Sequence, residues 1–306
     1  MPVILLSATN PPRLQHQMLM NFGLHSDRTA FIRSPTNRSE LGLHVIHLDP
    51  SAGLRALMRL VFALVRKLQA NDRMLVFFEC CQLAESFAKE HNFAIFHSKL
   101  PGSDIKSKNL RLWDSGATKV MACTSAFGFG VDRPNIRFVV IFNPKYSLLT
   151  TMQMAGRAGR DGMEAHVFLA TSERPPSIQE KDDLSFTLEL GQLMYQQVCR
   201  VYQAMYSMDG PEMARTCMEL RRQVPCDVCN PGSEMHLFVA KAVQDPTQGE
   251  QTSACMPLHV GTTHGSLKQT AIQPGEVLTN GDARAPRGMS LASTCPGAKV
   301  RVCCMA

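Results

Sequence analysis

Short apolar runs alternate with longer amphipathic segments from the first residues to about Ala170. The apolar runs are rich in β-branched and aromatic residues, which is typical of buried strands, and the amphipathic segments have the spacing of helices. The predicted strands are 3–6, 42–48, 74–78, 119–122, 138–142 and 166–170, and the predicted helices are 12–22, 51–70, 82–91, 103–113 and 148–158. This alternation predicts an α/β fold in which helices cover a mostly parallel sheet.

The pattern changes after about residue 172. Residues 186–208 form one long helical stretch without strands, which indicates a small helical unit. From Gln244 to Ala306 there is no Phe, Tyr or Trp, while Gly, Pro, Ser, Thr and Gln are frequent. Such a segment buries too little apolar surface to offset its ordering entropy, so we expect a disordered tail.

Composition adds little to this picture. A chain of 306 residues suits about two domains of ~100–200 residues. No apolar run reaches the ~18 residues of a membrane span, and the first residues are too short and uncharged for a signal peptide, so we expect an intracellular protein without a membrane partner. The net charge of +6 is not concentrated in a Lys/Arg run and favours a polyanionic partner only weakly.

The most specific motif is QMAGRAGRDG, residues 153–162. Arg157 and Arg160 can reach one anionic site together, and the glycines allow close approach of the backbone or a partner. Phosphoryl-transfer motors use such a cation to stabilise charge on the transferring γ-phosphate. A bare pair of arginines at this spacing would equally suit a solvated basic helix end, but the full string resembles motif VI of superfamily-two helicases in the form found in RecQ.

A second string, AFGFGVDRPNIR at residues 126–137, resembles motif V of RecQ helicases. Glycines beside Thr124 and Ser125 would let backbone N–H groups approach a phosphate, although a glycine-rich turn between a strand and a helix has the same composition. The resemblance implies that Thr124 and Ser125 lie near the DNA backbone. It also implies catalytic roles for Gln153, Arg157 and Arg160, and an ATP interface at Gly130, Asp132 and Gly156.

Weaker strings follow in the order of the family. Ser7-Ala8-Thr9 resembles motif III, and by this resemblance Ser7 and Thr9 are DNA-binding candidates that couple nucleotide state to DNA grip. Residues 74–78 and 96–98 resemble motif IV and the segment after it; we expect the apolar positions to be buried sheet, with His97 as a candidate functional residue. Residues 33–38 lie where the family joins its two lobes. Trp113 is expected in the core.

Eleven cysteines in an intracellular chain do not suggest a disulfide framework. One set, Cys199, Cys217, Cys226 and Cys229, follows motif VI and ends in a Cys-x-x-Cys knuckle. Four thiolates can close a tetrahedral structural zinc site, and RecQ proteins have a helical zinc subdomain that starts with Cys-Arg and ends with Cys-x-x-Cys. Cys217 lies farther from Cys226 than in bacterial members. Unrelated buried or free thiols are the alternative.

The resemblance covers residues 2 to 230, and no GxxxxGK[ST] loop or DExH box occurs in the chain. We therefore expect a truncated form of a RecQ-like helicase that is inactive alone. An intact member would use ATP with Mg²⁺, and structural Zn²⁺, for 3′–5′ unwinding of DNA in the nucleus, acting on single strands and duplex junctions. The expected organisation is a first-lobe remnant at 1–35, a RecA-like lobe at 36–172, a zinc subdomain at 173–232 and the tail at 233–306.

Three alternatives remain at this level. The chain could be a DNA- or partner-binding remnant without motor activity, a zinc-stabilised scaffold fragment, or a related RNA helicase lobe. The cysteines after motif VI argue against the last.

Overall fold

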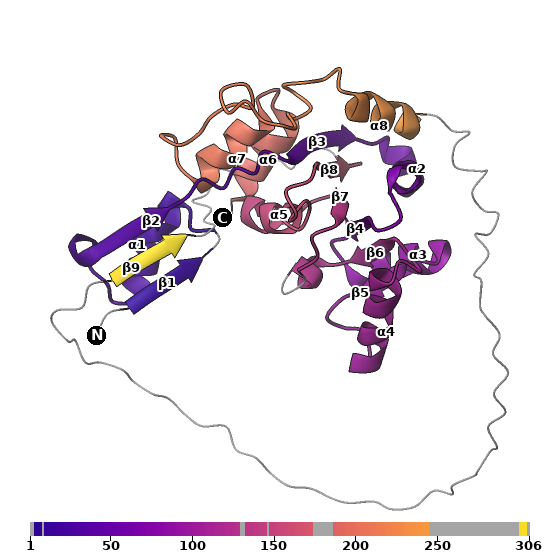
Figure 1. Cartoon of the computed structure of the whole chain (residues 1–306), viewed down its shortest axis with the longest axis horizontal. Helices are drawn as coiled ribbons and strands as arrows, with labels where there is room; N and C mark the ends of the chain where they lie inside the picture. The colour runs from indigo at the N-terminus through magenta and orange to yellow at the C-terminus, as the bar shows by residue number, and fades with distance from the viewer. Residues whose placement is uncertain are drawn as a thin grey trace, which may run out of the picture.

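The computed structural model describes residues 3–7, 9–128, 132–145, 147–173, 186–244 and 300–304. Its main feature is a sheet of six parallel strands (Figure 1). In spatial order the strands are β3 (Leu41–His47), β8 (Ala165–Thr171), β7 (Ile136–Phe142), β4 (Arg73–Phe77), β6 (Val120–Cys123) and β5 (Ala94–Phe96). The predicted parallel α/β fold is confirmed.

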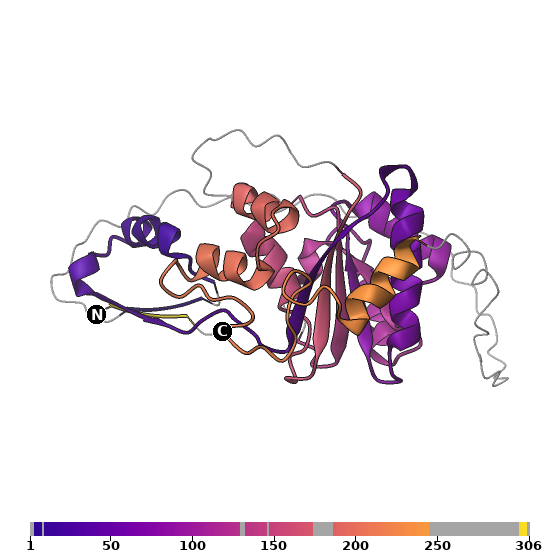
Figure 2. The same ribbon diagram turned by 90° about the horizontal axis from the view of Figure 1, so that it is seen from above.

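Alternate residues of a strand point to opposite sides of the sheet, and in these strands both sets are mostly apolar. Helices therefore cover both faces of the sheet. In β4, Leu75 and Phe77 join one buried cluster, whereas Met74 and Val76 join the other. The first face packs against α4 (Ser103–Asp114), α5 (Leu148–Ala155), α6 (Thr187–Tyr195) and α7 (Arg200–Met208). The second face packs against α2 (Gly53–Lys67), α3 (Cys81–His91) and α8 (Glu234–Gln244), as Figure 2 shows for α2 and α8.

Burial of Trp113 is confirmed: its side chain is fully buried and its Nε1 donates to the Met74 carbonyl at 3.3 Å. The edge strand β5 was not predicted, because three residues are too few to show a pattern.

A second, three-stranded sheet lies beside the first (Figure 1). Its strands are β1 (Val3–Ser7), β9 (Val300–Cys304) and β2 (Thr29–Arg33) in that order, all parallel, with α1 (Pro12–Asn21) between β1 and β2 in the chain. Neither β2 nor β9 was predicted from the sequence.

The single helical stretch predicted at 186–208 is wrong, because α6 ends at Tyr195 and α7 begins at Arg200. The Arg200 guanidinium donates to the carbonyls of Leu193 at 2.5 Å and Gln196 at 2.7 Å. It therefore satisfies acceptors that the end of α6 leaves without an intrahelical partner.

The prediction of a disordered tail from residue 233 is wrong for residues 234–244, which form α8. This helix packs on α2: Val239 is fully buried, the Arg59 guanidinium donates to the Val243 carbonyl at 2.9 Å, and the Lys67 ammonium lies 4.8 Å from the Phe238 ring centre. Aromatic-poor composition begins only after this helix. Residues 300–304 form β9, and the rest of the predicted tail lies outside the described residues. Among the described residues no helix has the length and apolarity to cross a membrane.

Candidate functional site

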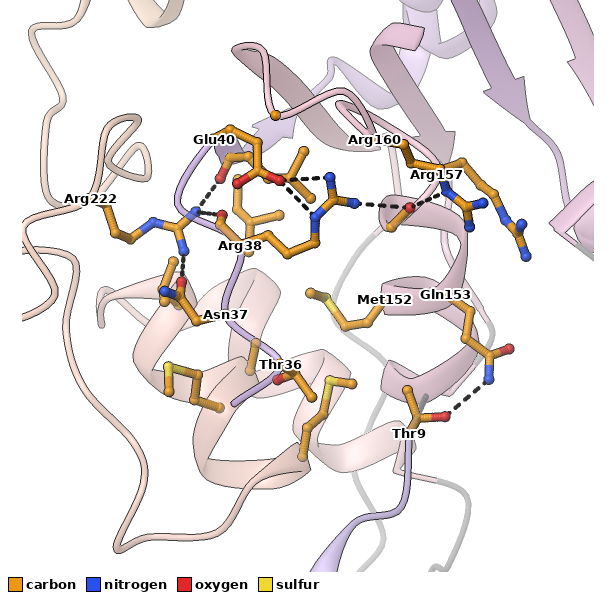
Figure 3. A pocket seen from close by; sticks show the side chains of 18 of the residues that line it. Thr9, Thr36, Asn37, Arg38, Glu40, Met152, Gln153, Arg157, Arg160 and Arg222 are labelled. Atoms are coloured by element: carbon orange, nitrogen blue, oxygen red, sulfur yellow. Dashed lines mark hydrogen bonds and ion pairs between the residues drawn. The ribbon is translucent and has the colours of Figure 1, made fainter. Parts of the chain in front are cut away.

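A cavity of about 740 Å³ brings together most of the residues predicted from the helicase-like strings (Figure 3). Its lining includes Thr9, Asp132, Gln153, Gly156, Arg157 and Arg160. These residues come from three segments of the chain that are far apart in sequence.

Helix α5 and the turn after it carry the arginines. Ser147 caps the start of the helix, its Oγ accepting from the Thr150 N–H at 3.2 Å. The helix ends at Ala155, and Gly159 lies in the turn with φ of +61°. A Cβ added at Gly159 would come within 3.0 Å of the Met163 carbonyl oxygen, so glycine suits this position on both conformational and steric grounds.

The two arginines of the turn differ in their surroundings. The Arg160 Nη1 lies 2.6 Å from Asp132 Oδ1, and this guanidinium holds the pKa of the exposed Asp132 below its usual range. Burial lowers the pKa of Arg157, and the nearby Arg160 charge lowers it further. Two arginines in one turn concentrate positive charge, and an anion bound in the cavity would partly neutralise it.

The segment from β1 touches α5 directly. Gln153 Nε2 donates to Thr9 Oγ1 at 3.2 Å, and the Thr9 N–H donates to Ser7 Oγ at 3.2 Å. The structure thus joins Ser7, Thr9 and Gln153 in one chain of hydrogen bonds (Figure 3 shows the Thr9–Gln153 contact).

Other predicted residues lie away from this cavity. Thr124 is buried and Ser125 is partly exposed where β6 ends, and neither lines it. His97 is fully buried, with its Nε2 2.8 Å from Glu85 Oε1. Gly130 lies outside the described residues.

Arg38 is a site residue that sequence reasoning missed. Its Nη1 donates to the Gly156 carbonyl at 3.2 Å and its Nη2 to the Gly159 carbonyl at 2.7 Å, while Glu40 pairs with it at 2.6 Å. The only sequence signal was its place in the expected linker at 33–38, which does not specify a partner.

The four predicted cysteines also come together. The sulfur atoms of Cys199, Cys217, Cys226 and Cys229 all lie within 4.8 Å of one another. Cys199 Sγ lies 3.6 Å from Cys217 Sγ and 3.9 Å from Cys226 Sγ. Hydrogen bonding from the Cys217 thiol, with a smaller contribution from Cys226, lowers the pKa of Cys199 and favours its thiolate form.

This geometry fits a zinc ion. At a Zn–S distance of ~2.3 Å, tetrahedral thiolates lie about 3.8 Å apart. Backbone N–H groups already point at two of the sulfurs, from Cys217 to Cys199 Sγ and from Cys226 to Cys217 Sγ, each at 3.3 Å. These donors stabilise negative charge on sulfur, so the donor set fits a closed four-thiolate site.

The cysteine cluster is fixed to the main sheet by a buried ion pair. Arg200 Nε donates to Asp227 Oδ1 at 3.0 Å, both side chains being almost fully buried. Asp227 also accepts from the Val45 N–H of β3 at 3.1 Å and donates its own N–H to the Leu43 carbonyl at 3.1 Å. The carboxylate inside the Cys-x-x-Cys knuckle therefore binds both α7 and β3.

Parts of this chain are similar to known proteins. Residues 53–162 match the family model described as helicase conserved C-terminal domain. "ATP-dependent DNA helicase Q-like 2" of Arabidopsis thaliana is 25% identical over 173 residues, covering 55% of this chain and 24% of that protein. "RecQ-like DNA helicase BLM" of Xenopus laevis is 28% identical over 173 residues, covering 55% of this chain and 12% of that protein. A variant of S. cerevisiae Dbp5 bound to RNA and ADP BeF3 has a TM-score of 0.48 and 15% identity, covering 78% of this chain and 54% of that chain.

Residues 53–162, which include four strands of the parallel sheet, are therefore similar to the C-terminal domain of helicases. By the curated relatives, the chain is similar to RecQ-like DNA helicases over 173 residues. It spans about a quarter or less of the length of these two curated relatives.

Proposed function

We propose that the chain supplies the arginine half of the ATPase site in a RecQ-like 3′–5′ DNA helicase. The observation that carries the proposal is that Gln153, Arg157 and Arg160 line the same cavity as Thr9 and Asp132. A phosphate loop and a Mg²⁺-binding acid would come from an ATP-binding lobe, because this chain has neither motif.

In this proposal ATP with Mg²⁺ provides the γ-phosphoryl group that is transferred to water. Arg157 and Arg160 stabilise the charge that develops on it, which is the arginine-finger role. Arg160 exchanges its exposed partner Asp132 for phosphate oxygens. Gly156 and Gly130 are proposed to line the nucleotide interface, and Gln153 couples it to Thr9.

DNA is the proposed polymer, on single strands and at duplex junctions, because the relatives are named as DNA helicases. Ser7, Thr9, Thr124 and Ser125 are its proposed contacts. The Gln153–Thr9 hydrogen bond supports these assignments, since it joins a residue of the proposed ATPase site to a proposed DNA contact. A nuclear location is proposed from the same relatives, and zinc as the metal of the four cysteines from their geometry.

The test is ATP hydrolysis by this chain joined to the ATP-binding lobe of a RecQ-like relative. Arg160→Ala should lower DNA-stimulated turnover by ~10³–10⁵-fold while nucleotide binding stays largely intact. Arg28→Ala is the matched control, because Arg28 is exposed and its ion pair, with Asp27 at 3.9 Å, lies away from the cavity. Near-normal turnover in both Arg160→Ala and Arg157→Ala would rule out the arginine-finger role.

A further inference from the structure

Arg38 holds the turn that carries the arginine motif. Helix α5 ends at Ala155, so the carbonyls just after it have no intrahelical partner. The Arg38 guanidinium donates to two of the carbonyls in this turn, those of Gly156 and Gly159, and its positive charge lies at the negative end of the helix dipole. Arg157 and Arg160 are therefore attached to backbone that Arg38 fixes (Figure 3).

Arg222 in turn holds the backbone of Arg38. Its Nη2 donates to the Arg38 carbonyl at 2.7 Å and also to the Leu41 carbonyl, while its Nη1 donates to the Asn37 side chain. Arg222 is only 8% exposed, so these acceptors replace the water that a buried guanidinium loses. The planar fork thus fixes the segment from Asn37 to Leu41 in one position.

Arg222 belongs to the loop between two cysteines of the cluster. Its N–H donates to the Cys217 carbonyl at 3.1 Å. Two residues later the Val224 N–H donates to the Ser39 carbonyl at 3.0 Å, and Cys226 follows. Cys217 and Cys226, the proposed metal ligands on either side of Arg222, therefore fix the backbone from which its side chain extends.

From these contacts we propose that the cysteine site orders the arginine motif through Arg222 and Arg38, which act as positioning residues. A metal held by Cys217 and Cys226 fixes the loop, Arg222 then fixes the backbone of Arg38, and Arg38 fixes Gly156 and Gly159. That this connection matters for ATP hydrolysis rests on the proposed function. The physical connection itself involves no nucleotide.

The test is amide hydrogen exchange on the whole zinc-loaded chain, read at Gly159 and Gly162. These two N–H groups donate to the Ile136 and Gly159 carbonyls, each at 2.9 Å, and report opening of the turn. Arg38→Met should speed their exchange by about tenfold, because charged hydrogen bonds to the turn are lost. Zinc should stay bound at one ion per chain, and exchange in β4 should stay unchanged.

Arg222→Met should produce the same increase with zinc still bound, so that the result does not depend on unfolding of the cysteine loop. Arg38→Lys, which keeps the charge but not the fork, should fall between wild type and Arg38→Met. Arg215→Met is the matched control, because Arg215 lies in the same loop region and, within the described part of the chain, donates only to the nearby carbonyls of Glu212 and Ala214.

Zinc removal by a chelator completes the test. It should speed exchange at Gly159 and Gly162 in the wild-type chain but add little in Arg38→Met, because the connection is already broken there. Additive effects of chelation and Arg38→Met would overturn the proposal, as would unchanged exchange in either positioning variant. Since no nucleotide is present, these results stand or fall separately from the ATPase test of the proposed function.

Discussion

At the scale of single residues, the structure adds most to the case for Cys217 as a metal ligand. Its spacing from Cys226 departs from the bacterial pattern, yet its sulfur lies within 4.8 Å of the other three. The chain between Cys217 and Cys226 folds back so that the Cys226 N–H reaches Cys217 Sγ. The longer loop thus closes the same kind of cluster.

We predict that the purified chain binds one zinc ion per chain and that Cys199→Ser, Cys217→Ser, Cys226→Ser and Cys229→Ser each release it. Loss of a structural zinc, which contributes on the order of 10 kcal/mol to folding of small modules, should make residues 199–229 protease-sensitive. Metal analysis and limited proteolysis measure both effects. Cys80→Ser is the control, because Cys80 is exposed and outside the cluster. Full zinc content in Cys217→Ser would exclude that cysteine as a ligand.

The sequence was enough to predict the arginines of the candidate site and the cysteines of the cluster, but not the contacts that position them. Arg157, Arg160 and the four cysteines were predicted from spacing and motif order. Arg38, Arg222 and Asp227 were missed as structural partners. The two arginines act mainly on backbone carbonyls distant in sequence, and Asp227 binds the distant Arg200 side chain and Val45 N–H. Nothing in a single sequence distinguishes a buried arginine that binds carbonyls from a solvated one.

At the scale of elements, periodicity predicted the strands that are buried on both faces and the longer amphipathic helices. It failed for the short edge strand β5, for β2 and β9, and at the break between α6 and α7. These features depend on pairing with distant strands or, at the break, on the Arg200 side chain, and not on local pattern. The sequence pattern also did not predict that α8 packs on α2, because the two helices are far apart in the chain.

Three histidines lie close together where α8 packs near β3 and β8. His44 is almost fully buried, with its Nε2 3.0 Å from His166 Nδ1 and its ring 6.4 Å from that of His236 on α8. Burial, with smaller contributions from His166 and His236, lowers the pKa of His44 from 6.5 to about 3, against a small opposing effect of Cys226. Glu164 also faces this group, 3.0 Å from His166 Nε2.

This arrangement predicts acid sensitivity. The neutral form of His44 is favoured in the folded state, so its contribution to stability is complete above about pH 6.5 and is lost as the pH falls toward about 3. The free energy of unfolding should decrease by ~1.4 kcal/mol per pH unit on account of this residue. His44→Phe, which can keep the stack on Phe168, should give a shallower decrease in denaturant titrations. The same change at the exposed His16 is the control. A slope equal to wild type in His44→Phe would contradict the prediction.

At the scale of the whole molecule, the cavity, the arginine turn and the cysteine cluster form one connected unit on the first face of the sheet. Figure 1 shows α5, α6 and α7 between the small sheet and the main one. Arg33 of β2 spans this region, donating to the Asn10 carbonyl at 2.6 Å and the Met208 carbonyl at 3.0 Å. Thr36 adds two hydrogen bonds to Asp209, from its N–H at 3.0 Å and its Oγ1 at 2.8 Å. The β1–β2 region is thereby held against α7, which keeps Thr9 in reach of Gln153.

A chain that provides only the arginine half of an ATPase site should not hydrolyse ATP alone. Its cavity is lined by the proposed arginine fingers, but the chain has no GxxxxGK[ST] loop to hold the nucleotide and no DExH acid for Mg²⁺. The measurement is DNA-stimulated phosphate release by the pure 306-residue chain, beside its Arg160→Ala variant. We expect both to match the background without protein. Robust turnover by the chain that disappears in Arg160→Ala would mean that it contains a complete ATPase site, contrary to the division proposed here.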